Sequence, residues 1–308
     1  MGFDRDVYYG KLLKGDLQGA INYVKQYPDQ AELYLRFVSI FEQERYHSYD
    51  VDNDLNAILL AYQQYYREVF YLRIERDQAA QKLRDRLVAV LGMAGCPTNL
   101  DELEQDHLPA LFMSRGLHFL GGKTSGWYGP YIWQTTETVS YDVELPDCIQ
   151  PYTVRLLDGF ISRSWIDYLS FGEIGPGGWS DGDGTIHCIK TAWDLDSEHF
   201  QVSLLKHEAQ HARDLKRIPD ISSTDLEFRA KLVELIYSTE RNLLISFAKE
   251  ADDSDSSNGH AMAAYRIVRG FEDALNVKEN AFSAVPMEQV RSTARILYEQ
   301  EMRAYIWD

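Results

Sequence analysis

Hydrophobic residues recur at three- and four-residue steps through the first third of the chain. The clearest run lies in residues 53–92, where a stripe of leucine, tyrosine and phenylalanine extends from Leu55 to Phe70 and the pattern stops at a glycine. This period predicts an amphipathic α-helix. We therefore expect one long helix over this run, preceded by helical stretches in residues 6–27 and 29–46.

The middle of the chain, residues 117–192, follows a different pattern. Glycine, aromatic and β-branched residues dominate it, and residues 138–145 alternate between apolar and polar as a half-buried strand does. Residues 161–172 are typical of a short helix, and residues 184–190 of a further strand. We expect a small, mostly antiparallel sheet in this part of the chain.

Helical periodicity returns after the sheet and continues to the end. Asp196 or Ser197 can cap a first helix, and Thr224 can begin the next one. Two final helices are expected near residues 259–275 and 286–305. Together these patterns predict an α+β fold, in which a helical N-terminal region and a helical C-terminal region flank the small sheet.

The change of pattern also predicts how the chain is divided. Its 308 residues are enough for two ordinary domains, each with a core of its own. We expect a helical N-terminal region in residues 1–115 and a second domain in residues 116–308, which would hold the sheet and the C-terminal helices.

The charge balance is acidic. The chain carries 31 Lys and Arg against 48 Asp and Glu, a formal net charge of −17, which argues against nucleic acid or an anionic membrane surface as a partner. We see no leader segment and no apolar run of membrane-spanning length. Three cysteines, Cys96, Cys148 and Cys188, lack CxxC spacing. These features predict a cytoplasmic protein with reduced thiols.

One short stretch of the C-terminal region carries chemistry: residues 207–211 read HEAQH. Residues four apart lie on one face of a helix, so His207 and His211 can direct ring nitrogens at one metal ion. Glu208 then points beside the ion, where a carboxylate can accept a proton from water. The pattern predicts a zinc site that activates water, and the alternative is a helix that carries two histidines without a metal.

Through HEAQH the chain resembles the zincin metallopeptidases and, among them, the gluzincin branch. The resemblance covers residues 184–240 at most, and the N-terminal region does not share it. It implies a Zn²⁺ ion held by His207, His211 and a glutamate of the following helix, and an upstream edge strand that binds an extended peptide. Such enzymes usually carry an apolar residue two positions after the second histidine, where this chain has Arg213.

Two glutamates of the following helix can supply the third ligand. Glu227 lies near the start of that helix, and Glu234 lies two turns further along the same face. The resemblance favours Glu227. Its alternative role is local, because Thr224 and Glu227 have the spacing of a capping box, in which the carboxylate accepts from the backbone amide of Thr224. A catalytic zinc takes three protein ligands and keeps one position for water, and either glutamate would serve.

Residues around the motif have less specific signals. Asp214 could orient a ligand ring or be an exposed charge near the helix end. Lys231 fits a solvated surface lysine slightly better than an ion-pair partner of a glutamate. A tetrahedral intermediate needs a donor beyond the metal, and we rank His260 first for this catalytic role because it follows an acidic loop. Its alternatives are Tyr237, Tyr265 and Arg266.

We therefore predict a zinc-dependent hydrolase, and specifically a metallopeptidase, in which Glu208 is the general base and a peptide or protein is the substrate. A prediction from another class is a protein-interaction module built on helical hairpins, with a structural or vestigial zinc site. A zinc hydrolase that acts on a non-peptide amide or ester also fits the pattern.

Overall fold

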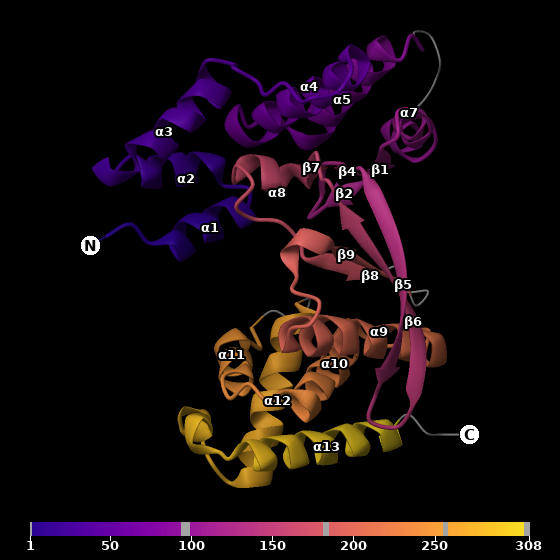
Figure 1. Cartoon of the computed structure of the whole chain (residues 1–308). Coiled ribbons are helices and arrows are strands. Elements are labelled where there is room, and N and C mark those ends of the chain that lie inside the picture. The colour runs from indigo at the N-terminus through magenta and orange to yellow at the C-terminus, as the bar shows by residue number, and fades with distance from the viewer. Residues whose placement is uncertain (1, 94–98, 181–184, 255–257, 305–308) are drawn as a thin grey trace. The chain divides into compact units, whose positions relative to one another are not determined.

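Figure 1 shows the computed structural model of the chain. The residues that it describes are 2–93, 99–180, 185–254 and 258–304, so Cys96 lies outside them. These residues form helices and small antiparallel sheets joined by loops, which confirms the predicted α+β class. No helix within these ranges is long and apolar enough to cross a membrane.

The chain divides into two compact units by its internal contacts. The first comprises Met1–Thr135 and Leu157–Pro176, and the second comprises Thr136–Leu156 and Gly177–Asp308. Each unit has its own cluster of buried hydrophobic residues. The strands that we assigned to one domain beginning at residue 116 are therefore shared between the two units.

The first unit consists of short helices and two small sheets. Its helical segments are α1 (Arg5–Leu13), α2 (Leu17–Val24), η1 (Pro28–Gln30), α3 (Ala31–Phe37), η2 (Val38–Glu42), α4 (Asn53–Tyr66), η3 (Arg67–Tyr71), α5 (Arg76–Val90), α6 (Leu100–Glu102), η4 (Leu103–His107), α7 (Leu108–Ser114) and α8 (Ser164–Leu169). Its strands are β1 (His118–Leu120), β2 (Lys123–Thr124), β3 (Trp127–Tyr128), β4 (Tyr131–Trp133) and β7 (Ser162–Arg163), in the sheets β1–β4–β7 and β2–β3.

The single long helix predicted over residues 53–92 is wrong, because the chain folds this run into α4 and α5. Arg73 adopts a left-handed φ of 57° after η3, and Glu75 then caps α5 by accepting a hydrogen bond from its first turn. The two helices pack against each other, which buries apolar residues of both in a way that one straight helix cannot. Gly15, with a φ of 68°, likewise divides residues 6–27 into α1 and α2.

The second unit combines a four-stranded sheet with a group of helices. The sheet order is β5–β6–β9–β8, with β5 (Thr135–Glu144), β6 (Ile149–Asp158), β9 (Thr185–Ile189) and β8 (Gly178–Ser180). The helical segments are η5 (Lys190–Ala192), η6 (His199–Lys206), α9 (His207–Arg217), α10 (Ser223–Tyr237), α11 (Leu243–Glu250), α12 (Gly259–Leu275), η7 (Glu279–Ala284) and α13 (Met287–Ala304).

The strand predicted just upstream of HEAQH is confirmed as β9, but it lies inside the sheet and the edges are β5 and β8. Ile186 and Cys188 of β9 are fully buried and belong to the same core as Ala209 and Ala212 of α9. This core fixes the helix that carries the motif to the sheet.

The first unit buries a carboxyl group. Glu104 of η4 is 2% exposed, and it accepts hydrogen bonds from the Tyr62 hydroxyl at 2.5 Å and from the Gly122 N–H at 2.6 Å. Burial raises the pKa of the Glu104 carboxyl to about 7, although both hydrogen bonds act in the opposite direction. The folded state therefore keeps a proton that the unfolded chain loses near pH 4.5.

We predict that Glu104→Gln flattens the pH dependence of this unit's stability. In the natural chain the stabilising contribution of Glu104 is fully present below pH 4.5 and is lost as the pH rises to about 7, a change on the order of 3 kcal/mol. Glutamine does not ionise, so this dependence should disappear. Native-state hydrogen exchange of α4 amides, corrected for intrinsic rates, measures it at about pH 5 and about pH 8. Glu102→Gln, at an exposed neighbouring position, is the control, and an unchanged dependence in Glu104→Gln would refute the prediction.

Candidate metal centre

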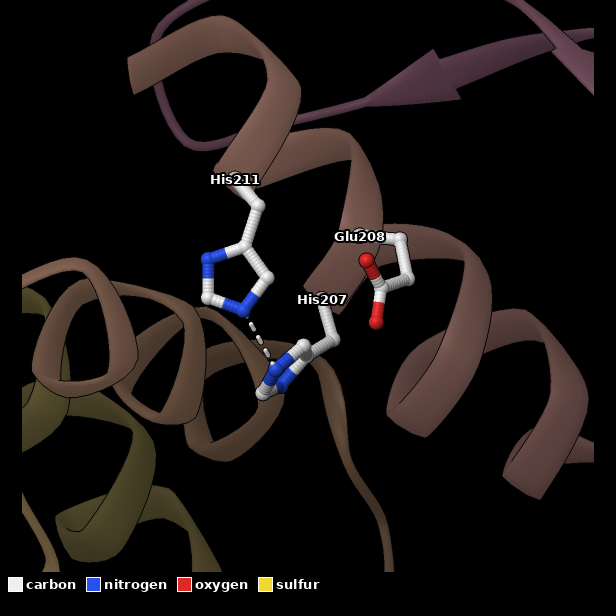
Figure 2. Close-up of side chains that lie close together, drawn as sticks. All are labelled: His207, Glu208 and His211. Atoms are coloured by element: carbon white, nitrogen blue, oxygen red, sulfur yellow. Dashed lines mark hydrogen bonds between the residues drawn. The ribbon is translucent and has the colours of Figure 1, made fainter. Parts of the chain in front are cut away.

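Helix α9 brings the two histidines of the motif together. The segment begins at Ser197, whose Oγ accepts from the Phe200 N–H at 3.1 Å, and the π-helical η6 then runs directly into α9. His207 Nε2 and His211 Nε2 lie 2.8 Å apart, with the rings edge to face (Figure 2). Both nitrogens are thus directed at one point, as their spacing predicts.

Glu227 of α10 adds a third donor group. One carboxylate oxygen lies 3.5 Å from His207 Nε2 and the other 3.4 Å from His211 Nε2. Oε2 is buried and also lies 3.0 Å from His260 Nδ1. Two ligands of a tetrahedral zinc ion with bonds near 2.0–2.1 Å are roughly 3.3–3.4 Å apart. The separations between Glu227 and the two histidines match this value, whereas the two imidazole nitrogens, at 2.8 Å, are about 0.5 Å closer than that, so the rings would have to move apart to admit an ion. The donor set itself, two imidazole nitrogens and one carboxylate, is one that zinc takes.

The local role considered for Glu227, a capping box with Thr224, is wrong. The N-cap of α10 is Ser222, and its Oγ accepts from the Asp225 N–H at 3.1 Å. The carboxylate of Glu227 takes no part in this cap and faces the histidines instead.

Glu234 lies on the other side of the His207 ring. Its Oε1 is 2.7 Å from His207 Nδ1, the nitrogen that is not directed at Glu227. A liganding histidine usually donates its second N–H to a carboxylate or carbonyl, which fixes the tautomer and orients the ring. The geometry therefore favours Glu227 over Glu234 as the third ligand, and it gives Glu234 the role of holding His207.

The buried charges of the site balance one another. Burial alone lowers the pKa of the His207 imidazole, but the carboxylates of Glu227 and Glu234 more than offset it and raise this pKa to about 10. Burial has the opposite effect on Glu227, and the imidazoles of His207, His211 and His260 hold the pKa of its carboxyl well below the usual range. The cluster therefore holds a proton that a metal ion must displace.

Glu208 lies beside both histidines, as Figure 2 shows. One of its carboxylate oxygens and a nitrogen of each histidine are all within 4.8 Å of one another. Burial, and then the nearby Glu208 carboxylate, raise the pKa of the Cys188 thiol on β9 to about 12. The carboxylate thus lies next to the two nitrogen donors and near the sheet, which is where a general base for water at the metal is needed.

His260, in the first turn of α12, lies at the edge of the cluster. Its Nδ1 is 3.0 Å from Glu227 Oε2, and its side chain is 62% exposed. Of its alternatives, Arg266 is held by two carboxylates of other helices, and the Tyr237 ring lies under a lysine ammonium group. His260 is therefore the predicted donor for which the structure records a direct contact with a candidate ligand.

Besides His211, three polar residues on α9 are buried, which the sequence did not reveal. Gln210 accepts from the Tyr298 hydroxyl at 3.1 Å and donates to Asp214 Oδ2 at 2.8 Å, and Arg213 pairs with Asp147. The suggestion that Asp214 is an exposed charge is wrong, since it is 0% exposed. Arg213, two positions after the second histidine of the motif, can be buried because the Asp147 carboxylate compensates its charge.

Two residues of α10 were also misjudged or missed. Lys231 is buried rather than solvated, and it donates to Glu250 at 2.8 Å. Arg229 lies 3.1 Å from Asp214, and the sequence carries no signal for this contact, because a lone arginine on a helix is usually solvated. For Glu234 a signal did exist, since it lies on the same face as Glu227, two turns on.

We predict that zinc binding at pH 8 releases close to one proton from the site, because His207, with a pKa of about 10, must lose a proton before it can bind the ion. An ordinary histidine would release almost none at this pH. Glu234→Gln should reduce the release, since it removes one of the two carboxylates that hold the proton. Calorimetry in buffers of different ionisation enthalpy measures it, with the exposed Glu240→Gln as control. Equal release from Glu234→Gln and the natural chain would contradict the prediction.

Comparisons with protein-family models, with curated proteins and with solved structures find no match for this chain. The candidate centre is therefore defined by its own side chains. These are the imidazoles of His207 and His211 with the Glu227 carboxylate between them, the Glu208 carboxylate beside them, and the Glu234 carboxylate at Nδ1 of His207.

Proposed function

We propose that the second unit is a zinc-dependent hydrolase of the metallopeptidase type, with the ion held by His207, His211 and Glu227. The supporting observation is that two imidazole nitrogens and a carboxylate converge in one buried place, with the carboxylate oxygens 3.5 and 3.4 Å from the two nitrogens. Two nitrogens and one oxygen are a donor set of catalytic zinc, and three protein ligands leave one position open.

Zinc in such a site supplies a Lewis acid that acidifies water and polarises a carbonyl group. The residues of the chain supply the rest. Glu208 accepts the proton of the attacking water and passes it to the leaving amine, for which its place beside both histidines is suited. His260 donates to the oxygen that gains negative charge. Glu234 keeps the proton of His207 on Nδ1 and so leaves Nε2 free.

The second candidate function is an interaction module with a structural ion. One observation favours it: His260 Nδ1 lies 3.0 Å from an oxygen of Glu227, so a fourth protein donor is close to the site. Structural zinc sites usually have four protein ligands and no open position. The two functions differ in their need for Glu208, because a structural site does not use a base.

We predict about one zinc per purified chain, and its loss in His211→Ala. Elemental analysis by plasma mass spectrometry measures this. The matched control is His199→Ala, which removes a histidine of η6 that packs against Trp193 with ring centroids 4.9 Å apart and should not affect zinc. A chain that stays metal-free when zinc is added would refute the proposed site.

We predict that Glu208→Gln keeps its zinc but cleaves peptides about 10²–10⁴ times more slowly, because only the proton acceptor is removed. A library of quenched fluorescent peptides provides the assay, and Glu299→Gln, exposed on α13, is the control. Full cleavage by Glu208→Gln would rule out the proposed base. A zinc-loaded natural chain that cleaves no peptide of the library would instead support the structural ion.

A further inference from the structure

Two buried polar atoms next to the candidate centre have no hydrogen-bond partner among the described residues. One is His211 Nδ1, the ring nitrogen directed away from His207 in Figure 2, and the other is Asp214 Oδ1. His211 is 7% exposed and Asp214 is 0% exposed. Leaving such a group unpaired costs about 1–3 kcal/mol. When His211 Nε2 binds a metal, Nδ1 carries a proton and is a donor, whereas Asp214 Oδ1 is an acceptor. The two atoms can therefore form a hydrogen bond with each other.

The two side chains lie on the same face of α9. Asp214 follows His211 by three positions, and residues at this spacing are neighbours on a helix surface. Burial raises the pKa of the Asp214 carboxyl. Arg229 and Gln210 lower this pKa, and so does the His211 ring, which is therefore within electrostatic reach of the carboxylate.

Asp214 is held in place through its other oxygen. Gln210 Nε2 donates to Asp214 Oδ2 at 2.8 Å, and Arg229 Nε lies 3.1 Å from the same atom. Both contacts use Oδ2. Oδ1 is therefore left to a partner that these two residues do not supply.

We infer that Asp214 is the positioning residue of His211: its Oδ1 accepts the Nδ1 proton of the ring, directly or through one water molecule, and so keeps Nε2 free for the metal. This inference rests on the proposed metal centre. It makes Asp214 the counterpart of Glu234, which holds the His207 ring in the same way.

The contact with Arg229 gives Asp214 a second effect. Arg229 is two residues after Glu227 on α10, so the ion pair joins the two helices that carry the ligands. The two side chains are only 1% and 0% exposed. Separating a buried pair leaves an uncompensated charge, so the pair resists sliding of one helix along the other. The position of Glu227 relative to His211 is thereby fixed by the fold itself.

Asp214→Asn tests the inference with little change of shape. Arg229 and Gln210 are donors, so the asparagine turns its oxygen to them and its NH₂ group to His211. A donor facing Nδ1 favours the ring tautomer that carries its proton on Nε2. A protonated Nε2 has no lone pair with which to bind a metal. We expect the zinc affinity of the full chain to fall about 10- to 100-fold, measured by competition with a chromophoric chelator.

The matched control is Asp147→Asn. It removes the carboxylate that pairs with Arg213, the residue next to Asp214 on α9. It should leave zinc affinity within about twofold, even if both variants lose similar stability in urea. If Asp214→Asn does not fold, Arg229→Lys replaces it, because lysine keeps the charge but lacks the guanidinium Nε that contacts Asp214 Oδ2. A loss of affinity no larger than that of Asp147→Asn overturns the inference.

Nitrogen NMR of the His211 ring in metal-free protein provides a readout that needs no zinc. The inference expects a protonated Nδ1 whose proton exchanges slowly in the natural chain and in Asp147→Asn, and its loss in Asp214→Asn. A ring protonated only at Nε2 in the natural chain overturns the inference. A natural chain that shows the protonated Nδ1 but binds no zinc refutes the proposed function and still supports the contact with Asp214.

Discussion

Charge compensation in a buried space is the constraint on which the second unit depends. The contact between α9 and α10 holds ionisable side chains from both helices. A single charge left there without a partner would cost several kcal/mol, as much as a small domain has to spare. Each carboxylate therefore faces an imidazole or a guanidinium group. The candidate metal centre is part of this arrangement, since its carboxylates and imidazoles also balance one another.

Helix α10 distributes its charged residues among three neighbouring helices. Glu227 and Glu234 face the histidines of α9, Arg229 pairs with Asp214 of α9, and Lys231 pairs with Glu250 of α11. Near its start a further ion pair joins it to α12. These contacts are directional, unlike hydrophobic packing, so they fix the rotation of α10 about its axis. That rotation places Glu227 beside the Nε2 atoms of both histidines and Glu234 beside Nδ1 of His207.

The sequence predicted the features that depend on local spacing, and it failed where distant packing decides. HEAQH places two histidines on one helical face wherever the helix lies, so their meeting was predictable. The break between α4 and α5 was not, because the helical pattern of the sequence continues past Arg73 to the glycine and only packing in three dimensions favours a hairpin. Asp214 illustrates the same limit. Near the end of a polar helix it resembles a solvated charge, but it is buried and pairs with Arg229 of α10.

Exposure differs sharply across the candidate centre, and this bears on its function. The side chains of His207, His211 and Glu227 are 12%, 9% and 10% exposed, whereas His260 is 62% exposed. A structural ion gains nothing from an open side, because its ligands should exclude water all round. A hydrolase needs one side at which substrate and water arrive. In the proposed hydrolase, the open position of the centre would therefore face the first turn of α12, and a substrate would meet His260 before any of the three candidate ligands.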